Sequence, residues 1–582
     1  MNNTLKRALF FLLVVASIGV PYVSVSSGGQ QVVINAALGW NTFMGSANID
    51  RGNTIAVDGS GNVYIAGDSE ATWGTPVNSF SGSYDVFVAK LNSNGVLQWN
   101  TFLGSTGLDY ASAIAVDGSG NVYVLGDSFA AWGSPVAAYS GGREPFVAKL
   151  NSDGELQWHT FMGSSGFDYS YGVAEDDSGN VYVVGYSPET WGSPVVAYVG
   201  SNDAFVAKLN SSGALQWNTF MGAADSDGGN GIAVDGSGNA YVVGTSNSTW
   251  GTPINAYVFS QDGFLVKLNS SGVRQWNTFL GSSNYDSCFG IDLDGIGNIY
   301  VSGYSYVTWG MPIDPHSGDF DGFAAKFDSS GIRQWNTFMG SAGYDTGRSI
   351  AVDTDGNACV VGESAATWGT PVIAHAGGGM DAFVVKLDST GIRQWNTFLG
   401  SGGYDVGSGT VVGGSGHVYV TGYSNATWGS PVNSFSGGSD AFGAKILDSA
   451  GEPEIHVRFG GINFADGSTR NLGTRTSSFI MGREFTFTIE NQGSEPLNLT
   501  GSPEVTLSGP QAAQFYVSLQ PISPVTTSGS TTFKLRPVRD SLPGFLPIGW
   551  TYPVSITVNI PNDDADENPY NFTLNFTLQK DS

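Results

Sequence analysis

Tryptophan recurs along this chain at a fixed spacing, and that spacing constrains the fold more than any other feature. One series opens a W-[NH]-T-F segment, and its successive intervals are 59 residues five times and then 60. A second series, in the segment [TA]-W-G-x-P, repeats the same intervals. Two tryptophan series with the same period predict a tandem array of equivalent structural units. The first series comprises Trp40, Trp99, Trp158, Trp217, Trp276, Trp335 and Trp395.

Each unit contains four short segments that have the composition of β-strands. In the first unit these segments are 40–44, 55–58, 63–67 and 87–91, and tight turns at 59–62 and 92–95 follow the second and the fourth. The segments are mostly apolar runs, which favours sheets that are covered on both faces. Seven units of four strands predict seven blades around an axis. Segment 40–44 is expected to supply the outer strand of the last blade, which would close the ring.

The repeated motifs resemble a known family. Each unit carries W-N-T-F-x-G, then a segment like I-A-V-D-x-x-G-N-V-Y-V-x-G, then D-A-F-V-A-K-L, with small variations. This pattern is similar to the SBBP-type β-propeller repeat of bacteria and archaea over residues 38–448. The resemblance implies a seven-bladed β-propeller on a secreted or cell-surface protein, and it implies no defined activity.

The period ends after the seventh unit, and residues 452–582 have a different pattern. Phe485, Phe487 and Ile489 alternate with polar residues, and so do the apolar residues of 554–560 and 570–578. This alternation predicts half-buried antiparallel strands in a β-sandwich. The run F-T-F-T-I-E-N-Q-G-S-E-P-L-N-L resembles the Ig-like domains called choice-of-anchor D and their Hydin-type relatives.

The N-terminus has the features of a secretory signal. Lys6 and Arg7 precede the apolar run 8–20, and Pro21 ends that run. We therefore expect residues 1–30 to be a signal peptide with a short linker, and the mature protein to be secreted or held at the cell surface without a transmembrane segment. The two cysteines, Cys288 and Cys359, occupy different positions of the repeat, so we expect them to be unpaired.

The strongly negative net charge argues against polyanionic partners. Fifty acidic residues against 23 basic ones give a formal charge of −27, which opposes binding to nucleic acid or to anionic membranes. Extracellular proteins, neutral glycans and cations stay open as partners.

Two series of side chains are the candidate ligand-binding residues, because propeller topology would place both on the face that carries the long loops. The acids of the first series are expected nearest the central channel. They are Asp50, Asp109, Asp168, Asp227, Asp286, Asp345 and Asp405, and the loop tryptophans are Trp73, Trp132, Trp191, Trp250, Trp309, Trp368 and Trp428. Another acid lies two residues before the Phe of each fourth segment: Asp85, Glu144, Asp203, Asp262, Asp321, Asp381 and Asp440.

These series allow a functional and a structural interpretation. Carboxylates around a mouth could bind Ca²⁺, and tryptophan faces could stack on sugars. Alternatively each Asp caps a turn and each Trp fills a gap between blades, and residue preferences favour this second interpretation. One Asp per loop is also a poor Ca²⁺ site, so Ca²⁺ is kept as a candidate cofactor and no metal ligands are assigned.

The sequence shows no catalytic constellation. The five histidines fall at unrelated positions of the repeat or in the second domain, and none has a metal-ligand spacing such as H-x-x-x-H. We therefore expect a noncatalytic binding or scaffold protein for adhesion or surface layers, in which seven equivalent weak sites act by avidity. One alternative is a carbohydrate-active or other hydrolytic enzyme that uses acids of the long-loop face. A purely structural spacer is the other.

Overall fold

The computed structural model describes residues 36–448 except Asp177 and Phe259, and much of 455–579. In the second part the described segments are 455–459, 462–464, 468–476, 485–491, 497–500, 502, 504–508, 510, 512–526, 530–537, 551–561 and 570–579. The expected signal segment 1–30 lies outside the described residues. Within the described residues there is no helix long and apolar enough to cross a membrane.

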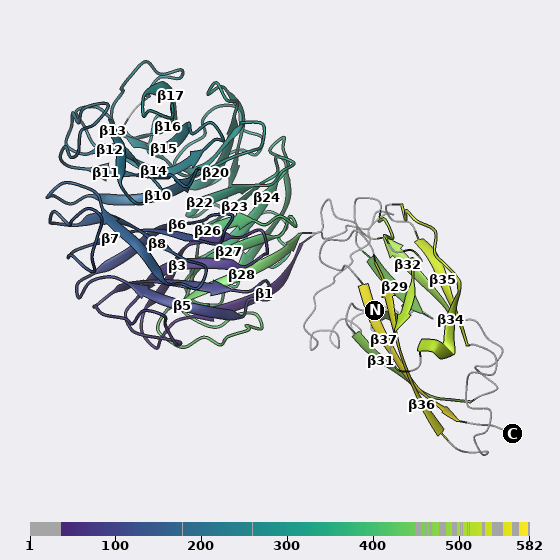
Figure 1. Ribbon diagram of the computed structural model, residues 1–582. Helices are drawn as coiled ribbons and strands as arrows, with labels where there is room; N and C mark the ends of the chain where they lie inside the picture. Colours follow the sequence, from purple (N-terminus) through teal and green to yellow (C-terminus); the bar gives the residue numbers. More distant parts are fainter. Residues whose placement is uncertain are drawn as a thin grey trace. The chain divides into compact units, whose positions relative to one another are not determined.

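Residues 36–448, which we call the ring, form four-stranded antiparallel sheets that follow one another along the chain (Figure 1). The described part of the ring contains seven such sheets, and in each sheet every strand is hydrogen-bonded to the one named after it. They are β2 (Asp50–Val57), β3 (Val63–Ser69), β4 (Asp85–Leu91) and β5 (Leu97–Leu103); β6 (Asp109–Val116), β7 (Val122–Ser128), β8 (Glu144–Leu150) and β9 (Leu156–Phe161); β10 (Tyr169–Glu175), β11 (Val181–Ser187), β12 (Asp203–Leu209) and β13 (Leu215–Met221); β14 (Asp227–Val234), β15 (Ala240–Ser246), β16 (Asp262–Leu268) and β17 (Arg274–Leu280); β18 (Asp286–Leu293), β19 (Ile299–Ser305), β20 (Asp321–Phe327) and β21 (Arg333–Met339); β22 (Asp345–Val352), β23 (Ala358–Ser364), β24 (Asp381–Leu387) and β25 (Arg393–Leu399); and β26 (Asp405–Val412), β27 (Val418–Ser424), β28 (Asp440–Asp448) and β1 (Ala36–Met44).

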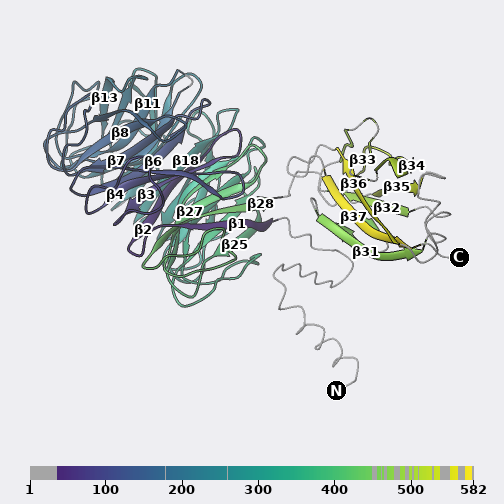
Figure 2. The ribbon, with the colours of Figure 1, turned by 60° about the horizontal axis from the view of Figure 1, so that its bottom comes forward.

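The last sheet takes its outer strand from the beginning of the ring. Strand β1 pairs antiparallel with β28, so that Trp40 lies opposite Lys445 and Phe43 opposite Phe442. Figure 2 shows β1 beside β28, although the two are separated by almost the whole ring in sequence. The pairing expected for segment 40–44 is therefore present. It joins the two ends of the ring by main-chain hydrogen bonds.

The first strand of each sheet packs against the first strands of its neighbours. Strand β2 contacts β6 on one side and β26 on the other, so the series of sheets closes on itself. We call the interface between two neighbouring sheets a junction. Each junction holds its own cluster of buried apolar residues, and the cluster between the last and the first sheet includes Met44, Ile65 and Tyr419. The apolar runs predicted from the sequence are thus buried on both faces of the sheets.

The strands are longer than the sequence pattern predicts, and the difference concerns the candidate acids. The pattern predicts 55–58 as the second strand of the first unit, whereas β2 begins at Asp50; likewise β4 begins at Asp85. Six of the seven first-series acids and all seven second-series acids are the first residue of a strand, and Asp168 directly precedes β10. The sequence pattern places the acids in loops because polar residues normally lie outside apolar strands.

The end of the ring that carries the tight turns holds a repeated lysine. In six sheets the Lys Nζ lies over the ring of a Tyr on the neighbouring strand, at 4.6 to 5.8 Å from the ring centroid. In the remaining sheet Cys359 replaces the Tyr, and Lys386 forms ion pairs with Asp353 and Asp448. Cys359 and Cys288 are both buried and free, as the sequence predicted.

The described residues of 455–579 form two further sheets. One contains β30 (Ile462–Phe464), β29 (Ile455–Phe459), β32 (Phe485–Asn491), β35 (Ser530–Pro537) and β34 (Phe515–Leu519) in that order. The other contains β31 (Ser468–Thr476), β37 (Tyr570–Gln579), β36 (Thr551–Ile560) and β33 (Thr506–Ser508), and the 3-10 turn η1 (Ala512–Gln514) precedes β34.

Both of these sheets contribute to one buried core, which includes Phe487, Phe533 and Val558. The alternation predicted for 485–489 and 554–560 therefore faces a shared interior. One pairing differs from the expected antiparallel arrangement, because β31 and β37 run parallel.

Replacing Phe43 by Ala tests the closing strand. Phe43 is 1% exposed and packs edge-on against Trp428 and Phe435, so we expect a loss of about 3–5 kcal/mol in the free energy of unfolding. Phe102→Ala, at the equivalent position of β5, should cost the same, and Val96→Ala, at an exposed residue, should cost less than about 0.5 kcal/mol. Urea unfolding followed by tryptophan fluorescence measures all three. A small loss for Phe43→Ala beside a large one for Phe102→Ala would show that β1 is not packed into the last sheet.

Candidate functional site

The seven acids of the first series do not line an open mouth. Their side chains are 0–1% exposed. In each case Oδ2 accepts a hydrogen bond from the backbone N–H four residues earlier, as Asp109 does from Ser105 at 2.7 Å. These contacts are those of a turn-capping Asp, which is the structural interpretation of the series. The strands enclose these side chains, so the contacts seen here are those of the turn-capping interpretation and not of a carboxylate-lined mouth.

The loop tryptophans are also enclosed. Trp73 packs edge-on against Phe87 at 5.3 Å and Phe102 at 6.0 Å, and the same pair of phenylalanine positions surrounds the other members. Six of the seven are 6–9% exposed, and Trp132 is half-buried and stacked on His159. Their faces are used inside the ring, so stacking on sugars by this series is not supported.

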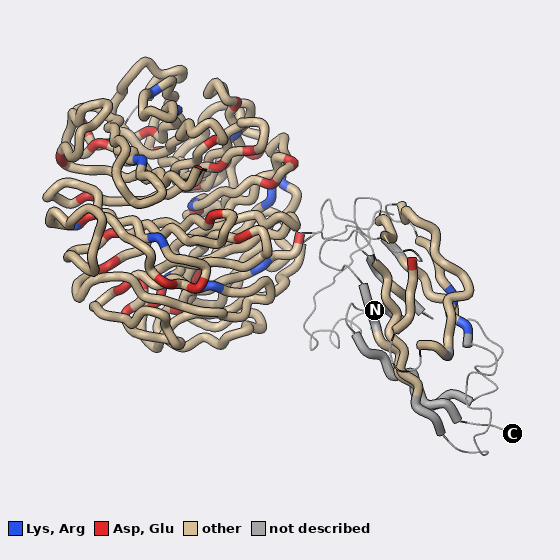
Figure 3. Tube along the Cα trace, in the orientation of Figure 1, with Lys and Arg blue, Asp and Glu red and all other residues tan. Residues whose placement is uncertain are grey.

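The structure brings the two acid series together. Each second-series acid begins the third strand of its sheet. It lies at the same junction as the first-series acid at the beginning of the first strand of the next sheet. The glycine that follows the W-N-T-F-x segment lies against both: a side-chain carbon on Gly340 would be 2.8 Å from Asp321 Oδ1 and 2.9 Å from Asp345 Oδ2. Figure 3 shows that acids are spread through the whole ring. The pairs are Asp85 with Asp109, Glu144 with Asp168, Asp203 with Asp227, Asp262 with Asp286, Asp321 with Asp345, Asp381 with Asp405, and Asp440 with Asp50.

Burial makes these carboxyl groups weaker acids. Burial and, more weakly, the neighbouring carboxylate of the pair raise the pKa of Asp85 and of Asp440 to about 6. Hydrogen bonds from Ser81 and Ser436, respectively, act in the opposite direction but do not compensate. The paired acids are therefore costly to keep ionised inside the ring.

A different set of residues lies at one repeated position on the first strands of the sheets, where Tyr171 and Arg348 are exposed and the other members are half-buried. Each first strand carries a β-bulge, which places one extra residue opposite its partner strand. Bulges re-aim side chains and often lie beside functional sites. We call these residues the bulge ring: Asn53, Ser112, Tyr171, Asn230, Phe289, Arg348 and Ser408.

Exposed aromatic residues surround part of the bulge ring. Besides Tyr171, they directly precede first-series acids and therefore lie where the chain enters the first strands. Their exposed fractions lie between 42% and 55%. In other units the same position holds Ile49, Leu108 or Ser226, so the aromatic residues occupy the third, fifth, sixth and seventh sheets and not the full circle. We call this set the aromatic rim: Phe167, Tyr171, Tyr285, Tyr344 and Tyr404.

Two arginines near the first strands, Arg143 and Arg348, have acidic partners. The Arg143 guanidinium lies 4.0 Å from the ring centroid of Tyr169, and Arg143 Nη2 lies 2.7 Å from Asp127 Oδ2. Arg348, a member of the bulge ring, donates a hydrogen bond from Nη2 to Glu363 Oε1 at 2.7 Å. Arg143 also lies over the rings of Tyr110 and Phe129, so it combines an acidic partner with aromatic contacts.

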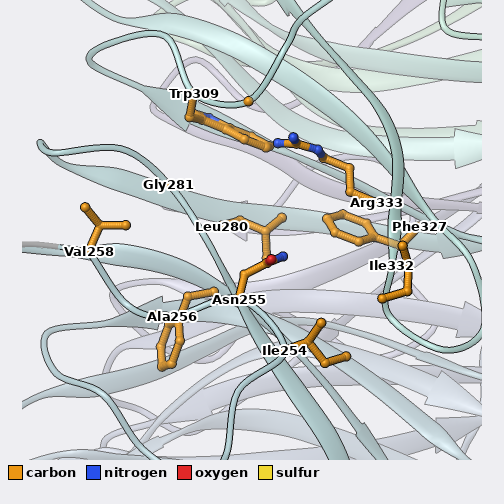
Figure 4. Close-up of a pocket in the computed structure, with 12 residues that line it drawn as sticks. Ile254, Asn255, Ala256, Val258, Leu280, Gly281, Trp309, Phe327, Ile332 and Arg333 are labelled. Carbon is orange, nitrogen blue, oxygen red and sulfur yellow. The ribbon is translucent and has the colours of Figure 1, made fainter.

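One cavity lies away from the bulge ring. It has a volume of about 340 Å³ and is lined by residues that include Ile254, Leu280, Trp309 and Arg333 (Figure 4). Figure 4 shows the Arg333 side chain extending to Trp309, and its guanidinium lies 5.2 Å from the indole centroid. The Arg–Trp contact recurs in two other units, at Arg274 and Arg393, so it belongs to the repeat and covers the indole.

The bulge ring and the aromatic rim escaped prediction from the sequence. The predicted sites were residues that recur in every unit, whereas these positions hold different residues in different units. Four residues separate Asp168 from Val173, and the corresponding stretch between the invariant Asp and the following apolar residues differs in every unit. A search for variable positions inside an otherwise strict repeat would have found them.

The buried carboxyl group of Asp68, beside the bulge ring, predicts a pH dependence of stability. Burial raises its pKa to about 6, although the Ala111 N–H and the Asn53 amide donate hydrogen bonds to it. The folded state therefore binds this proton more tightly than the unfolded chain, and its contribution to the free energy of unfolding increases as the pH falls from about 6 to about 4. In the Asp68→Asn variant, the melting temperature should therefore change less with pH between about pH 4 and pH 6 than in the wild type.

Asp58→Asn is the matched control. Burial raises the pKa of Asp58, but hydrogen bonds from Asn62 and Ser60 outweigh this effect and hold the pKa below its ordinary value. Protonation of Asp58 therefore affects stability only at lower pH. Its melting profile should keep the wild-type slope between about pH 4 and 6. An Asp68→Asn profile that is parallel to the wild type would contradict the assignment.

Several solved structures are similar to this chain. The WD40 domain of Neurospora crassa Pan2 aligns with a TM-score of 0.39 and 10% identity, covering 71% of this chain and 95% of that one. A protein of unknown function from Dyadobacter fermentans has a TM-score of 0.37 and 10% identity, with coverages of 72% and 100%. The extracellular domain of a putative hybrid two component system from B. thetaiotaomicron has a TM-score of 0.32 and 11% identity, with coverages of 94% and 58%.

Curated relatives and a family model complete the comparison. The regulatory protein FlaEY of Caulobacter vibrioides is 26% identical over 418 residues, which are 64% of this chain and 43% of FlaEY. An uncharacterized WD repeat-containing protein, L264 of Acanthamoeba polyphaga mimivirus, is 25% identical over 240 residues, 32% of this chain and 17% of that protein. This chain spans less than half the length of either relative. The family model described as a beta-propeller repeat, SBBP, matches residues 38–72 and 216–249, so the chain contains β-propeller repeats.

Proposed function

We propose that this chain is a noncatalytic, secreted or cell-surface binding protein of bacteria or archaea. In this proposal the ring is a seven-bladed β-propeller of the SBBP type, and residues 452–582 are an Ig-like domain of the choice-of-anchor D or Hydin type. The N-terminal segment with Lys6, Arg7 and the apolar run after them supports export. The four-stranded sheets and the matched repeat segments support the propeller.

One observation carries the binding role. The aromatic rim and the bulge ring expose Tyr, Phe and Arg side chains at the place where the units cease to be equivalent. Tyrosine and arginine are the side chains most enriched at protein interfaces and at their energetic centres. Because the aromatic residues occupy four of the seven sheets, we propose an asymmetric binding surface in place of seven equivalent weak sites. Its partner is an extracellular protein, or a glycan that stacks on the exposed rings.

The enzymatic alternative has less support. A hydrolase of glycosides needs two carboxyl groups in one pocket that substrate can enter. The paired acids of the ring recur at every junction and are at most 2% exposed. The alternative of a pure spacer predicts no ligand, and it does not account for aromatic side chains that are about half exposed at the aromatic rim.

A binding screen with variants of the aromatic rim tests this function. Wild-type protein and a Tyr285→Ala, Tyr344→Ala double variant would be applied to arrays of glycans and of extracellular proteins. We expect the wild type to bind a subset of one array, and the double variant to bind it at least about tenfold more weakly, because truncating central aromatic anchors costs more than 1 kcal/mol each.

The matched control carries Val273→Ala and Ile392→Ala, two residues that are 44% and 54% exposed at the tight turns. This variant should bind like the wild type. No ligand on either array would support the spacer, and release of sugar from an arrayed glycan would support the enzyme.

A further inference from the structure

The cavity of Figure 4 lies between the fourth and the fifth sheet of the ring. Leu280, which ends β17 of the fourth sheet, and Arg333, which begins β21 of the fifth, both line it. Its volume of about 340 Å³ falls at the lower end of the range for sites that bind small molecules, about 300–1,000 Å³. None of the described residues that line it belongs to the bulge ring or to the aromatic rim, so it is a separate candidate site.

Apolar side chains form most of the wall of this cavity. Leu280 and Phe327 are at most 3% exposed and belong to its inner part. Ile254, Val258 and Ile332 are 40–55% exposed, so they belong to its opening. An apolar body that enters the cavity would cover these exposed side chains, and the removal of apolar surface from water is favourable.

Arg333 is the one charged residue among those that line the cavity. Its side chain is half-buried, and the guanidinium lies 5.2 Å from the centroid of the Trp309 indole (Figure 4). No carboxylate of a described residue forms an ion pair with it, whereas Arg143 and Arg348 each have an acidic partner. Burial lowers the pKa of the Arg333 guanidinium, which nevertheless stays charged. A positive charge without an acidic partner thus borders a largely apolar cavity.

The positive charge is not needed to cover the indole. The residue two positions before the Trp of W-[NH]-T-F is Leu in four units and Arg in three. In three of the Leu units this side chain packs in the same apolar cluster as the loop Trp of its sheet. An apolar side chain is therefore sufficient for this contact, and the guanidinium is available for another one. The leucines are Leu38, Leu97, Leu156 and Leu215, and the arginines are Arg274, Arg333 and Arg393.

A guanidinium beside apolar walls suits a carboxylate that is attached to an apolar body. Two parallel N–H donors of Arg match the two oxygens of a carboxylate. One guanidinium balances one negative charge, whereas a phosphate monoester carries about 1.5 to 2 negative charges near neutral pH. The net charge of −27 repels anions at long range, but physiological salt screens exposed charges beyond about 8 Å and weakens partly buried contacts much less.

We propose that the cavity between the fourth and the fifth sheet binds a small organic acid that joins one carboxylate to an apolar chain or ring. Arg333 binds the carboxylate, and the walls that include Leu280 and Phe327 cover the apolar body. This site shares no residue with the aromatic rim, so it is independent of the binding surface proposed above.

Pairs of probes that differ in charge and match in size test the site on the full chain. Octanoate and phenylpropionate would be titrated by saturation-transfer NMR, with the amide of each acid as its neutral counterpart. We expect at least one acid to bind saturably, and at least about tenfold more tightly than its amide, because hydrogen bonds between charged groups are stronger than neutral ones. Equal affinity of acid and amide, or no binding of either acid, would overturn the proposal.

Arg333→Leu locates the carboxylate. This variant carries the residue that four other units have at the same position, so the ring should fold. It should bind the acid no more tightly than the amide. The matched control is Arg393→Leu, the same change in the sixth sheet at a residue that does not line the cavity, and it should keep the preference for the acid. A preference that both variants keep, or that both lose, would refute the assignment to Arg333.

Ala256→Phe locates the apolar body without removing the charge. Ala256 lines the cavity from the loop between β15 and β16, and a larger side chain there should weaken binding of acid and amide alike. Ala374→Phe, at the equivalent exposed position of the sixth sheet, should bind like the wild type. Unchanged binding by Ala256→Phe would place the probes elsewhere and contradict the proposal. Array binding by Arg333→Leu separates these results from the fate of the proposed function, because the aromatic rim is intact in that variant.

Discussion

The ring depends on the packing of each four-stranded sheet against its two neighbours. No single sheet encloses a core, because its apolar residues face outward on both sides and become buried when the next sheet covers them. Such a series stays exposed at its two ends unless the ends meet. The pairing of β1 with β28 brings them together, and the cluster that contains Met44, Ile65 and Tyr419 completes the last junction. Every other feature of the ring follows from this closure.

Closure has opposite consequences for two kinds of residue at the start of the first strands. Acids such as Asp109 and Asp345 are enclosed at the junctions, where burial raises their pKa. The residues next to them, such as Tyr344, face solvent and are free to differ between units. A strict repeat therefore supports both an identical interior and a varied surface. Each β-bulge inserts one residue and shifts the pairing register by one, and the residue at the bulge has no partner on the neighbouring strand.

Several features could be predicted from the sequence because they depend on local pattern and on period. The four strands of each unit follow from the apolar runs and the glycine turns, and the outer strand 40–44 follows from counting units. The alternation at Phe487 and Ile489 predicts their burial, and both are at most 1% exposed. The free thiols of Cys288 and Cys359 follow from their different positions in the repeat.

The role of the acids could not be predicted in the same way. Asp50 and Asp85 are of a residue type that is common in loops and rare in strands, and nothing in the sequence indicates that strands extend to include them. The pairing of the acids also depends on the tertiary structure, because the two members of a pair, such as Asp85 and Asp109, belong to different sheets. The repeated tryptophans were similarly ambiguous: a recurring indole suits both a sugar platform and an interior contact, and the surrounding phenylalanines decide for the interior.

The number of units, their strands and the place where the chain closes on itself could be inferred from the sequence, because periodicity and polarity are properties of the linear chain. Which residues meet solvent could not, since that depends on how the sheets pack. Exposure depends on the neighbouring sheet, which covers Trp73 and Asp109 and leaves Tyr285 and Tyr344 open. Position within a repeat indicates equivalence between units. The side that each residue presents to its neighbours is set by how the sheets pack.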